Sequence, residues 1–341
     1  MIVRSRAPLR VGLAGGGTDV SPYSDVYGGC ILNATINMFA YTTIETRDDG
    51  RVNFEALDIE KTYQGDASAN IKLSGDLILH KAIYNRVVKD FNKNQPLSLN
   101  VITHSDAPPG SGLGSSSTMV VSILAAYREL LKLPLGEYDL AHLAFEIERE
   151  DCKLSGGKQD QYAATFGGVN FMEFHKESVL VNPLRIRADI LNELESQIVL
   201  YFTGISRDSG KIIDDQIKAA GDTDNSKSLE SLHLVKQHAF AMKECLLRNE
   251  ISGMSAILKA SWEAKKGTSS SISNPHVEKI SALALENGAT SLKLSGAGGG
   301  GFMMIFVEPT KKLPLMKLLA KTNGQIHKFQ LTQNGVQAWT V

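Results

Sequence analysis

A glycine- and serine-rich segment, Pro108–Ser117, is the part of the sequence whose residue types most clearly indicate chemistry. It reads Pro-Pro-Gly-Ser-Gly-Leu-Gly-Ser-Ser-Ser and joins a predicted strand to a predicted helix. Glycines let the backbone approach a ligand closely, and the N–H groups at a helix start attract anions. The segment therefore predicts a phosphate-binding loop; a tight turn with a serine cap is the alternative. We expect ligand contacts from Pro109, Gly110, Ser111, Gly112, Leu113, Gly114, Ser115, Ser116 and Ser117.

Two better-known phosphate motifs are excluded by the sequence. The P-loop pattern, in which Gly-Lys-Ser/Thr follows a glycine at a fixed spacing, occurs nowhere in the chain. A Gly-x-Gly-x-x-Gly pattern does occur at Gly296–Gly301, but the apolar run Phe302–Phe306 that follows it predicts a strand, not a helix. This context argues against a dinucleotide-binding site.

Asp160 is the candidate for the group that acts on an acceptor hydroxyl. It follows Gly156 and Gly157 and precedes the apolar stretch Tyr162–Phe166. Phosphoryl transfer needs positioned phosphates, a metal ion and a group that orients or deprotonates the acceptor. Asp160 fits the last role, and a helix-capping aspartate is the alternative.

Glu148, twelve residues before Asp160, is the candidate metal ligand. It falls one turn after Ala144 on a helix predicted over 137–151, on the face that also carries Ala141. That face should be buried, and a buried acid needs a reason.

A Mg²⁺ ion held by Glu148 together with Ser116, or with Ser115, would supply that reason. A surface position for Glu148 is the alternative, and Glu146 and Glu150 are competing acids.

The composition excludes several other classes of function. Lys and Arg total 36 against 37 for Asp and Glu, and this balance indicates neither a nucleic-acid partner nor a membrane surface. The three cysteines are far apart and form no zinc cluster or disulfide framework. The most apolar early stretch, 30–41, is too short and too polar to span a bilayer. We expect a cytoplasmic protein.

The periodicity predicts mixed helices and strands without regular alternation, hence an α+β fold and not a doubly wound sheet. Tyr41–Arg47, a turn at Asp48–Gly50 and an apolar run from Val52 predict a hairpin. The polar stretch 221–227 predicts a surface loop. With 341 residues we expect two domains, 1–185 and 186–341. Further strands are predicted at 96–105, 198–203, 289–294 and 302–307, and helices at 79–91, 115–132, 228–247, 251–265 and 275–286.

Three segments, in order, resemble the motifs of the galactokinase, homoserine kinase, mevalonate kinase and phosphomevalonate kinase (GHMP) family. They are Ala7–Asp19, Pro108–Ser117 and Leu292–Phe302, which together span nearly the whole chain. The resemblance implies an N-terminal domain resembling part of a ribosomal protein, a ferredoxin-like C-terminal domain, and a site between them. It also implies ATP as the phosphate donor and Mg²⁺ as the metal.

The resemblance assigns roles to individual residues. Asp160 corresponds to the aspartate that faces the sugar hydroxyl in galactokinases, and Arg10 to an arginine near the transferred phosphate. Glu148 and Ser116 correspond to a Ser–Glu pair that holds the metal. Backbone packing of Ser295–Gly301 would support the phosphate loop. The residues expected to bind substrate are Gly16, Gly17, Thr18, Asp19, Gly157, Lys158, Arg207 and Gly298.

Within the family, the first motif departs from galactokinases, because Gly16 and Gly17 stand where those enzymes carry a sugar-contacting Glu and His. The segments at 14–19, 159–162 and 201–207 most resemble bacterial D-glycero-D-manno-heptose 7-phosphate kinases. That implies phosphorylation of the anomeric hydroxyl of a sugar phosphate for surface-polysaccharide synthesis. A fucokinase-like sugar kinase is one alternative, and a non-catalytic sugar-binding regulator is another; a homodimer is left open.

A phosphorylated acceptor would need cations beyond those that serve ATP. Arg207 follows a predicted strand end, Lys158 lies two residues before Asp160, and Lys211 lies one helical turn after Arg207. A guanidinium can hold a phosphate through two hydrogen bonds, so Arg207 is the preferred candidate. Solvated surface charges are the alternative for all three.

Overall fold

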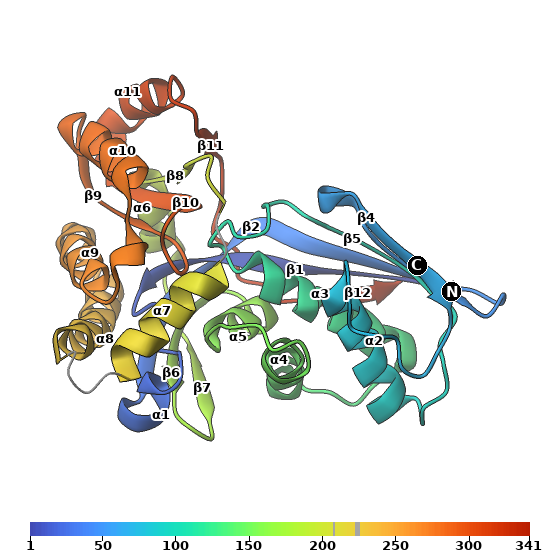
Figure 1. The fold of residues 1–341 in the computed structure, drawn as a ribbon. Helices are drawn as coiled ribbons and strands as arrows, with labels where there is room; N and C mark the ends of the chain where they lie inside the picture. Colours follow the sequence, from blue (N-terminus) through green and yellow to red (C-terminus); the bar gives the residue numbers. More distant parts are fainter. Residues whose placement is uncertain (207–208, 222–225) are drawn as a thin grey trace.

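The computed structural model of this chain contains two β-sheets that share a hydrophobic core (Figure 1). It describes residues 1–206, 209–221 and 226–341. Arg207 and most of the expected surface loop at 221–227 therefore lie outside the described residues. No helix in the described part of the chain is long and apolar enough to cross a membrane.

The larger sheet has eight strands and forms a long, twisted layer (Figure 1). Its main order is β12-β1-β2-β5-β3-β4, with β6 beside β2 and β7 beside β6. The long strand β2 pairs with β6 through its first half and with β5 through its second half. The strands are β1 (Ile2–Ala14), β2 (Gly29–Thr46), β3 (Arg51–Ala56), β4 (Lys61–Asp66), β5 (Leu99–Ser105), β6 (Val169–Phe174), β7 (Val179–Pro183) and β12 (Gln337–Thr340).

The hairpin expected between Tyr41–Arg47 and the run from Val52 is wrong, because β5 lies between β2 and β3. Val101 pairs with Ile44 on one side and with Phe54 on the other. The turn at 48–50 carries the chain past the place that β5 later fills. Local turn signals could not reveal a pairing made by a strand some fifty residues further along the chain.

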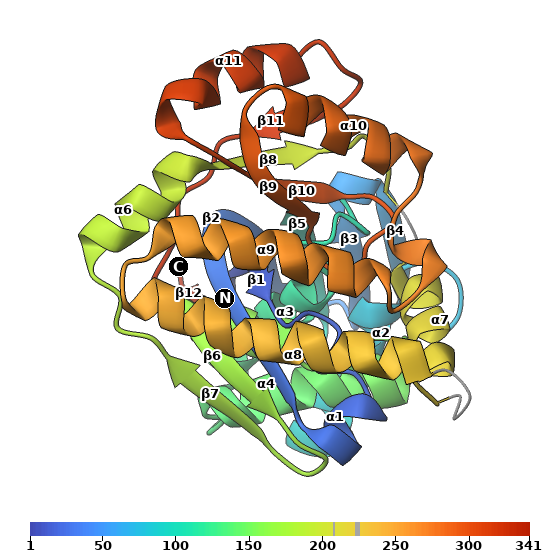
Figure 2. The ribbon, with the colours of Figure 1, turned by 90° about the vertical axis from the view of Figure 1, so that its left-hand side faces the viewer.

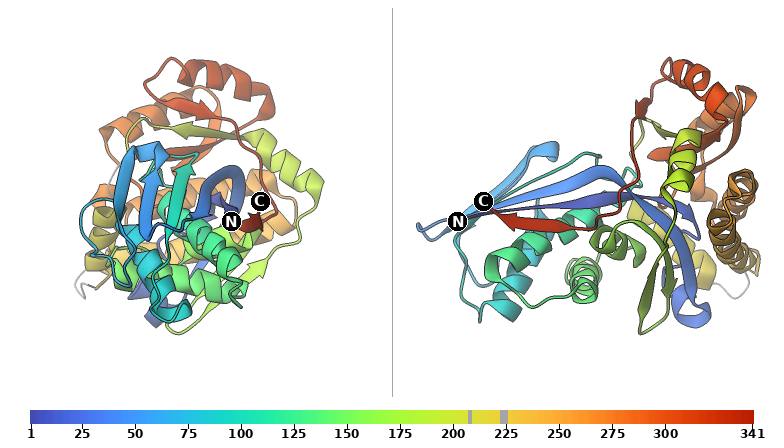
Figure 3. Two further views of the ribbon diagram at one scale, coloured as in Figure 1. Left: turned by 90° about the vertical axis from the view of Figure 1, so that its right-hand side faces the viewer. Right: turned by 180° about the vertical axis from the view of Figure 1, so that it is seen from behind.

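Helices cover one face of this sheet (Figure 1; Figure 3, right). The central one is α3, whose predicted apolar residues Met119, Ile123 and Ala126 are all buried in the core. The helices of this half are α1 (Tyr23–Tyr27), α2 (Ile78–Phe91), α3 (Ser115–Leu131), α4 (Glu137–Glu146) and α5 (Gln159–Phe166), with a short 3-10 turn at Leu57–Ile59.

The smaller sheet has the order β11-β8-β10-β9. Its central strand β10 reads Phe-Met-Met-Ile-Phe-Val and is buried throughout. Since side chains alternate across a strand, Phe302, Met304 and Phe306 join one apolar cluster, and the residues between them join another. The strands are β8 (Ile198–Phe202), β9 (Ala289–Leu294), β10 (Phe302–Val307) and β11 (Gln325–His327).

Helices lie on both sides of the smaller sheet. Apolar residues of α6, α8 and α9 join the cluster shared with the larger sheet, and those of α10 and α11 cover the opposite face. Figure 2 shows α8 and α9 lying side by side across the molecule. The helices are α6 (Ala188–Gln197), α7 (Ser209–Gly221), α8 (Ser226–Leu247), α9 (Ile251–Lys266), α10 (Pro275–Glu286) and α11 (Pro309–Leu319), with a 3-10 turn at Ser270–Ile272.

The chain passes from the larger sheet to the smaller one between β7 and β8 and returns at its end. Because Val3 pairs with Thr340, the two termini lie close together (Figure 3). The α+β class is confirmed, and so is the predicted strand at 302–307; the strand predicted at 96–105 forms over 99–105. The boundary between domains 1–185 and 186–341 stays a prediction.

Candidate functional site

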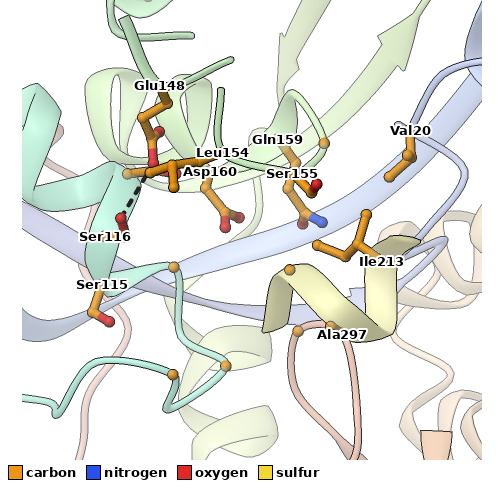
Figure 4. A pocket seen from close by; sticks show the side chains of 18 of the residues that line it. Val20, Ser115, Ser116, Glu148, Leu154, Ser155, Gln159, Asp160, Ile213 and Ala297 are labelled. Atoms are coloured by element: carbon orange, nitrogen blue, oxygen red, sulfur yellow. Dashed lines mark hydrogen bonds between the residues drawn. The ribbon is translucent and has the colours of Figure 1, made fainter. Parts of the chain in front are cut away.

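A cavity of about 550 Å³ lies where the two halves of the molecule meet. The loop after β1, the loop before α3, the segment before α5 and the loop between β9 and β10 all reach it. Figure 4 shows Asp160, Ser116 and Glu148 on one side, with Ile213 of α7 and Ala297 facing them. The three glycine-rich motifs of the sequence therefore converge on one site.

The predicted phosphate loop forms one wall of this cavity. Gly110, Gly112 and Gly114 all have positive φ, and α3 begins directly after Gly114. The start of α3 thus presents backbone N–H groups and the positive end of the helix dipole to the cavity. Two predicted contacts differ: Ser111 and Leu113 are fully buried and do not line it. The loop residues that do line it are Pro109, Gly110, Gly112, Gly114, Ser115, Ser116 and Ser117.

The glycine run between β9 and β10 packs its backbone directly on the phosphate loop. A Cβ added at Gly112 would lie 2.4 Å from the carbonyl oxygen of Ser295, and one at Gly301 would lie 2.2 Å from that of Ser111. The supporting role expected for 295–301 matches this contact. Gly298, in contrast, faces the backbone of Ile272 and is not in the cavity wall.

Arg10 and Asp160 meet at the centre of the site. Arg10, on β1, is buried, and its Nε and Nη2 both lie 2.7 Å from Oδ1 of Asp160. Its Nη1 donates to the carbonyl oxygen of Gly112 at 2.6 Å. Arg10 therefore connects the Asp160 carboxylate to the phosphate loop. Its guanidinium contacts Oδ1 of Asp160 and donates no hydrogen bond to Oδ2.

Glu148 is buried, as its helical position predicted, and it accepts a hydrogen bond from Oγ of Ser116 at 3.2 Å (Figure 4). The helix predicted over 137–151 is α-helical only as far as Glu146, where α4 ends. A π-helical turn, Ile147–Asp151, follows it. Such turns are rare and occur often at functional sites. Gln161, absent from the sequence-based assignment, donates from Nε2 to both Glu148 and Ser117.

The donors around Glu148 fit a hard divalent cation. A buried carboxylate and a hydroxyl face the cavity beside the phosphate loop, and Mg²⁺ binds through one or two protein oxygens plus substrate phosphates and water. The competing acids are placed differently, since Glu146 pairs with Arg86 and Glu150 is exposed. In the part of the chain that the structure describes, no group of three His, Cys, Asp or Glu could hold a metal by itself.

Asp19 is the buried carboxylate at the other end of the site. Its Oδ2 accepts the backbone N–H of Gln159 at 3.1 Å, and its Oδ1 accepts that of Gly17 at 3.3 Å. Burial raises the pKa of this carboxyl, and the nearby charge of Asp160 raises it further. Gly157 lets the backbone approach this carboxylate closely, because a Cβ there would lie 1.9 Å from Oδ2 of Asp19.

The other predicted substrate contacts divide into two groups. Gly17 and Gly157 line the cavity with Asp19, whereas Gly16 and Thr18 do not. The Thr18 hydroxyl donates to the carbonyl oxygen of Gly15 at 2.8 Å, which is a structural role within the loop.

Lys158 also lies outside the cavity wall. It directs its ammonium away, donating to the carbonyl oxygen of His175 at 2.9 Å and lying 3.5 Å from Asp25. Lys211, on α7, is exposed and is not in the wall either.

Two cations in the cavity wall were missed by the sequence reasoning. Arg149 donates to the carbonyl oxygens of Leu154 and Gly157, each at 3.2 Å, and so holds the segment that precedes Asp160. Lys265, near the end of α9, is buried and donates to the carbonyl oxygen of Gly296 at 2.6 Å. Neither belongs to a motif, and a lysine in an amphipathic helix normally indicates a solvated face.

Comparisons with known proteins agree with this geometry. The family model described as GHMP kinases N terminal domain matches residues 79–168, and the model GHMP kinases C terminal matches 242–315. A D-glycero-alpha-D-manno-heptose 7-phosphate kinase from Campylobacter jejuni is 49% identical over 99% of both chains.

Two further relatives extend the comparison. A crystal structure described as a D-glycero-D-manno-heptose 1-phosphate kinase from Bacteroides thetaiotaomicron is 43% identical, covers 99% of each chain and superposes with a TM-score of 0.85. An L-fucokinase/L-fucose-1-P guanylyltransferase from Bacteroides fragilis is 26% identical over 94% of this chain, which spans 36% of that longer protein.

Proposed function

The chain belongs to the GHMP kinase family and is a sugar kinase, and we propose that its acceptor is D-glycero-D-manno-heptose 7-phosphate. Phosphorylation of the anomeric hydroxyl would give the 1,7-bisphosphate, a precursor for nucleotide-activated heptose and surface polysaccharide. The observation that carries this proposal is the 49% identity, over nearly the full length, to a relative named for that sugar phosphate.

ATP is the phosphate donor of GHMP sugar kinases, and the loop before α3 is where its phosphates would bind. Anions are stabilised at a helix start by unpaired N–H groups and by the helix dipole. The positive φ values of Gly110, Gly112 and Gly114 suit a backbone that curves closely around a ligand. A bound triphosphate would then extend toward Asp160, because Gly114 lies against that side chain.

Asp160 would act on the acceptor through Oδ2, the carboxylate oxygen that Arg10 does not contact. The hydroxyl oxygen attacks the γ-phosphorus, the bond from that phosphorus to the β–γ bridging oxygen breaks, and ADP leaves. The hydroxyl proton passes to Asp160. Arg10, fixed between Asp160 and Gly112, would place positive charge beside the transferred group.

Ser116 and Glu148 would hold Mg²⁺ beside the ATP phosphates. When bound there, the ion neutralises charge that develops on the phosphate oxygens. The carboxylate of Glu148 is kept in position by Gln161, whose Nε2 donates to it at 2.5 Å.

Two relatives suggest different acceptors and define the competing proposals. One solved relative is described as a heptose 1-phosphate kinase. With that acceptor, the sugar would already carry the 1-phosphate when it binds. A fucokinase-like activity is the other, supported by the 26%-identical bifunctional enzyme. A non-catalytic regulator is set aside because these relatives are kinases. A homodimer and a cytoplasmic location stay predictions.

An ADP-release assay with purified protein, ATP and Mg²⁺ tests the proposal. The acceptors compared are heptose 7-phosphate, heptose 1-phosphate, free heptose, L-fucose, galactose and mevalonate. We expect the highest kcat/KM with heptose 7-phosphate. A higher value with heptose 1-phosphate or with L-fucose would replace the proposed acceptor by that sugar.

A further inference from the structure

Lys265 is a buried lysine whose ammonium group reaches the cavity from the C-terminal half of the chain. It stands one residue before the end of α9, is 4% exposed and belongs to the cavity wall. Its Nζ donates to the carbonyl oxygen of Gly296, and a Cβ added at Gly16 would lie 3.5 Å from it. An ammonium group has three donors, so one bond to Gly296 leaves donors for a ligand.

The charges around Lys265 come from three elements. Arg10 lies on β1, Asp19 lies in the loop after it, and Lys293 lies on β9 with its Nζ bonded to the carbonyl oxygen of Gly12 at 2.8 Å. Burial lowers the pKa of Lys265 to about 8, against an opposing effect of the Asp19 carboxylate. Burial also lowers the pKa of Lys293, and the nearby positive charge of Lys265 lowers it further.

An ammonium donor and a carboxyl acceptor therefore face one cavity from opposite halves of the molecule. Asp19 is held by backbone N–H groups of Gly17 and Gln159, and Lys265 by the carbonyl of Gly296. Isolated charges are costly to bury, and a ligand that hydrogen-bonds to both would offset that cost. Neighbouring hydroxyls of a sugar suit this pair, since each hydroxyl can donate one hydrogen bond and accept another.

We propose that Lys265 is an acceptor-binding residue that, together with Asp19, holds two neighbouring hydroxyls of the sugar. Asp19 would accept a hydrogen bond from one of these hydroxyls, and Lys265 would donate a hydrogen bond to the other. Both halves of the chain would therefore bind the sugar. This inference rests on the proposed sugar kinase function but not on which sugar is the acceptor. A phosphate group is a poorer ligand here, because the carboxylate of Asp19 would repel it.

The test compares wild type with Lys265→Met and Lys265→Arg. The control is Lys259→Met, which makes the same change at an exposed position on the same helix. With the best acceptor found for the wild type, Lys265→Met should lower kcat/KM for the sugar by about 10- to 150-fold, the effect of one hydrogen bond to a charged group. The KM for ATP and the melting temperature should match those of Lys259→Met.

The pH profile separates a charged donor from a packing role. Wild-type kcat/KM for the sugar should fall above about pH 8 as Lys265 loses its proton. In Lys265→Arg this fall should disappear, because a guanidinium stays charged throughout that range. An unchanged alkaline limb in Lys265→Arg, or a Lys265→Met variant as active as Lys259→Met, would overturn the proposal.

The identity of the group that Lys265 contacts is tested with paired acceptors. Lys265→Met should lower kcat/KM by the same factor for heptose 7-phosphate and for free heptose. A loss confined to the phosphorylated sugar would mean that Lys265 binds phosphate, and the diol assignment would be wrong. If wild type uses neither heptose, the proposed acceptor fails, and the same comparison is made with deoxy forms of the sugar that it does use.

Discussion

Arg10 and Asp160 are 150 residues apart in the sequence, yet two nitrogens of the arginine lie 2.7 Å from the same carboxylate oxygen of the aspartate. This contact joins the first strand of the chain to the start of α5 at the floor of the cavity. In the function proposed above, this contact orients Asp160 so that its second oxygen, Oδ2, would accept the proton of the acceptor hydroxyl.

Replacing Asp160 by asparagine should lower kcat by about 10²–10⁴-fold, the usual contribution of a positioned general base. The amide keeps the size of the side chain but cannot take up a proton. Initial rates at saturating ATP and sugar measure the effect, with Asp58→Asn at an exposed turn as the matched control. A variant within a few-fold of wild type would show that Asp160 is not the base.

Replacing Glu148 by glutamine should raise the Mg²⁺ concentration that gives half-maximal rate by at least about tenfold. Changes in outer-shell residues alone cost about 10–100-fold in metal affinity, and this change removes an anionic ligand. Glu150→Gln, two residues away and exposed, should titrate as wild type does. If Glu150→Gln raised the required Mg²⁺ concentration and Glu148→Gln did not, Glu148 would not be the metal ligand.

Replacing Gly114 by alanine should lower kcat by about 10- to 100-fold, because small misplacements of a catalytic group are costly. The new Cβ would lie 3.0 Å from Cγ of Asp160 and would press on that side chain. Gly75→Ala is the control: Gly75 has φ +68° against +77° for Gly114, and its Cβ would meet nothing within 4 Å. Both variants bear similar backbone strain, so the melting temperature should fall in both, while only Gly114→Ala loses rate. Equal losses of kcat would contradict the contact.

His80 should make the protein less stable in mild acid. Burial lowers the pKa of this histidine to about 4, against about 6.5 in an unfolded chain. Between these values the unfolded state binds the proton and the folded state does not. Stability is therefore full above about pH 6.5 and falls by up to about 3 kcal/mol as the pH drops toward 4.

Urea unfolding at pH 7 and at pH 4.5 measures this effect. The loss of stability between the two pH values should be about 2–3 kcal/mol smaller in His80→Gln than in wild type. His142→Gln changes a largely exposed histidine and should behave as wild type does. Parallel behaviour of all three proteins would show that His80 carries a proton in the folded state.

The sequence predicted the parts of the site that lie in continuous motifs. Glycines before a helix, and an acid on an apolar helical face, have local physical causes. The place of the glycine-rich loop in the cavity wall and the burial of Glu148 could therefore be predicted before the fold was known.

Lys265 could not be predicted, because its place in the cavity depends on how α9 packs beside the loop after β9. The direction of the Lys158 side chain depends on Asp25 and His175, which are distant in sequence. The position of β5 between β2 and β3 is likewise set by pairing across the sheet, not by the turn at 48–50.

Phosphorus NMR of the reaction product tests the central claim most directly. With ATP, Mg²⁺ and D-glycero-D-manno-heptose 7-phosphate, the wild type should give one new phosphomonoester coupled to the anomeric proton, with one ADP formed for each 1,7-bisphosphate. Asp160→Asn should give almost none in the same time. A new phosphate on another carbon, or transfer to heptose 1-phosphate with none to the 7-phosphate, would contradict the account.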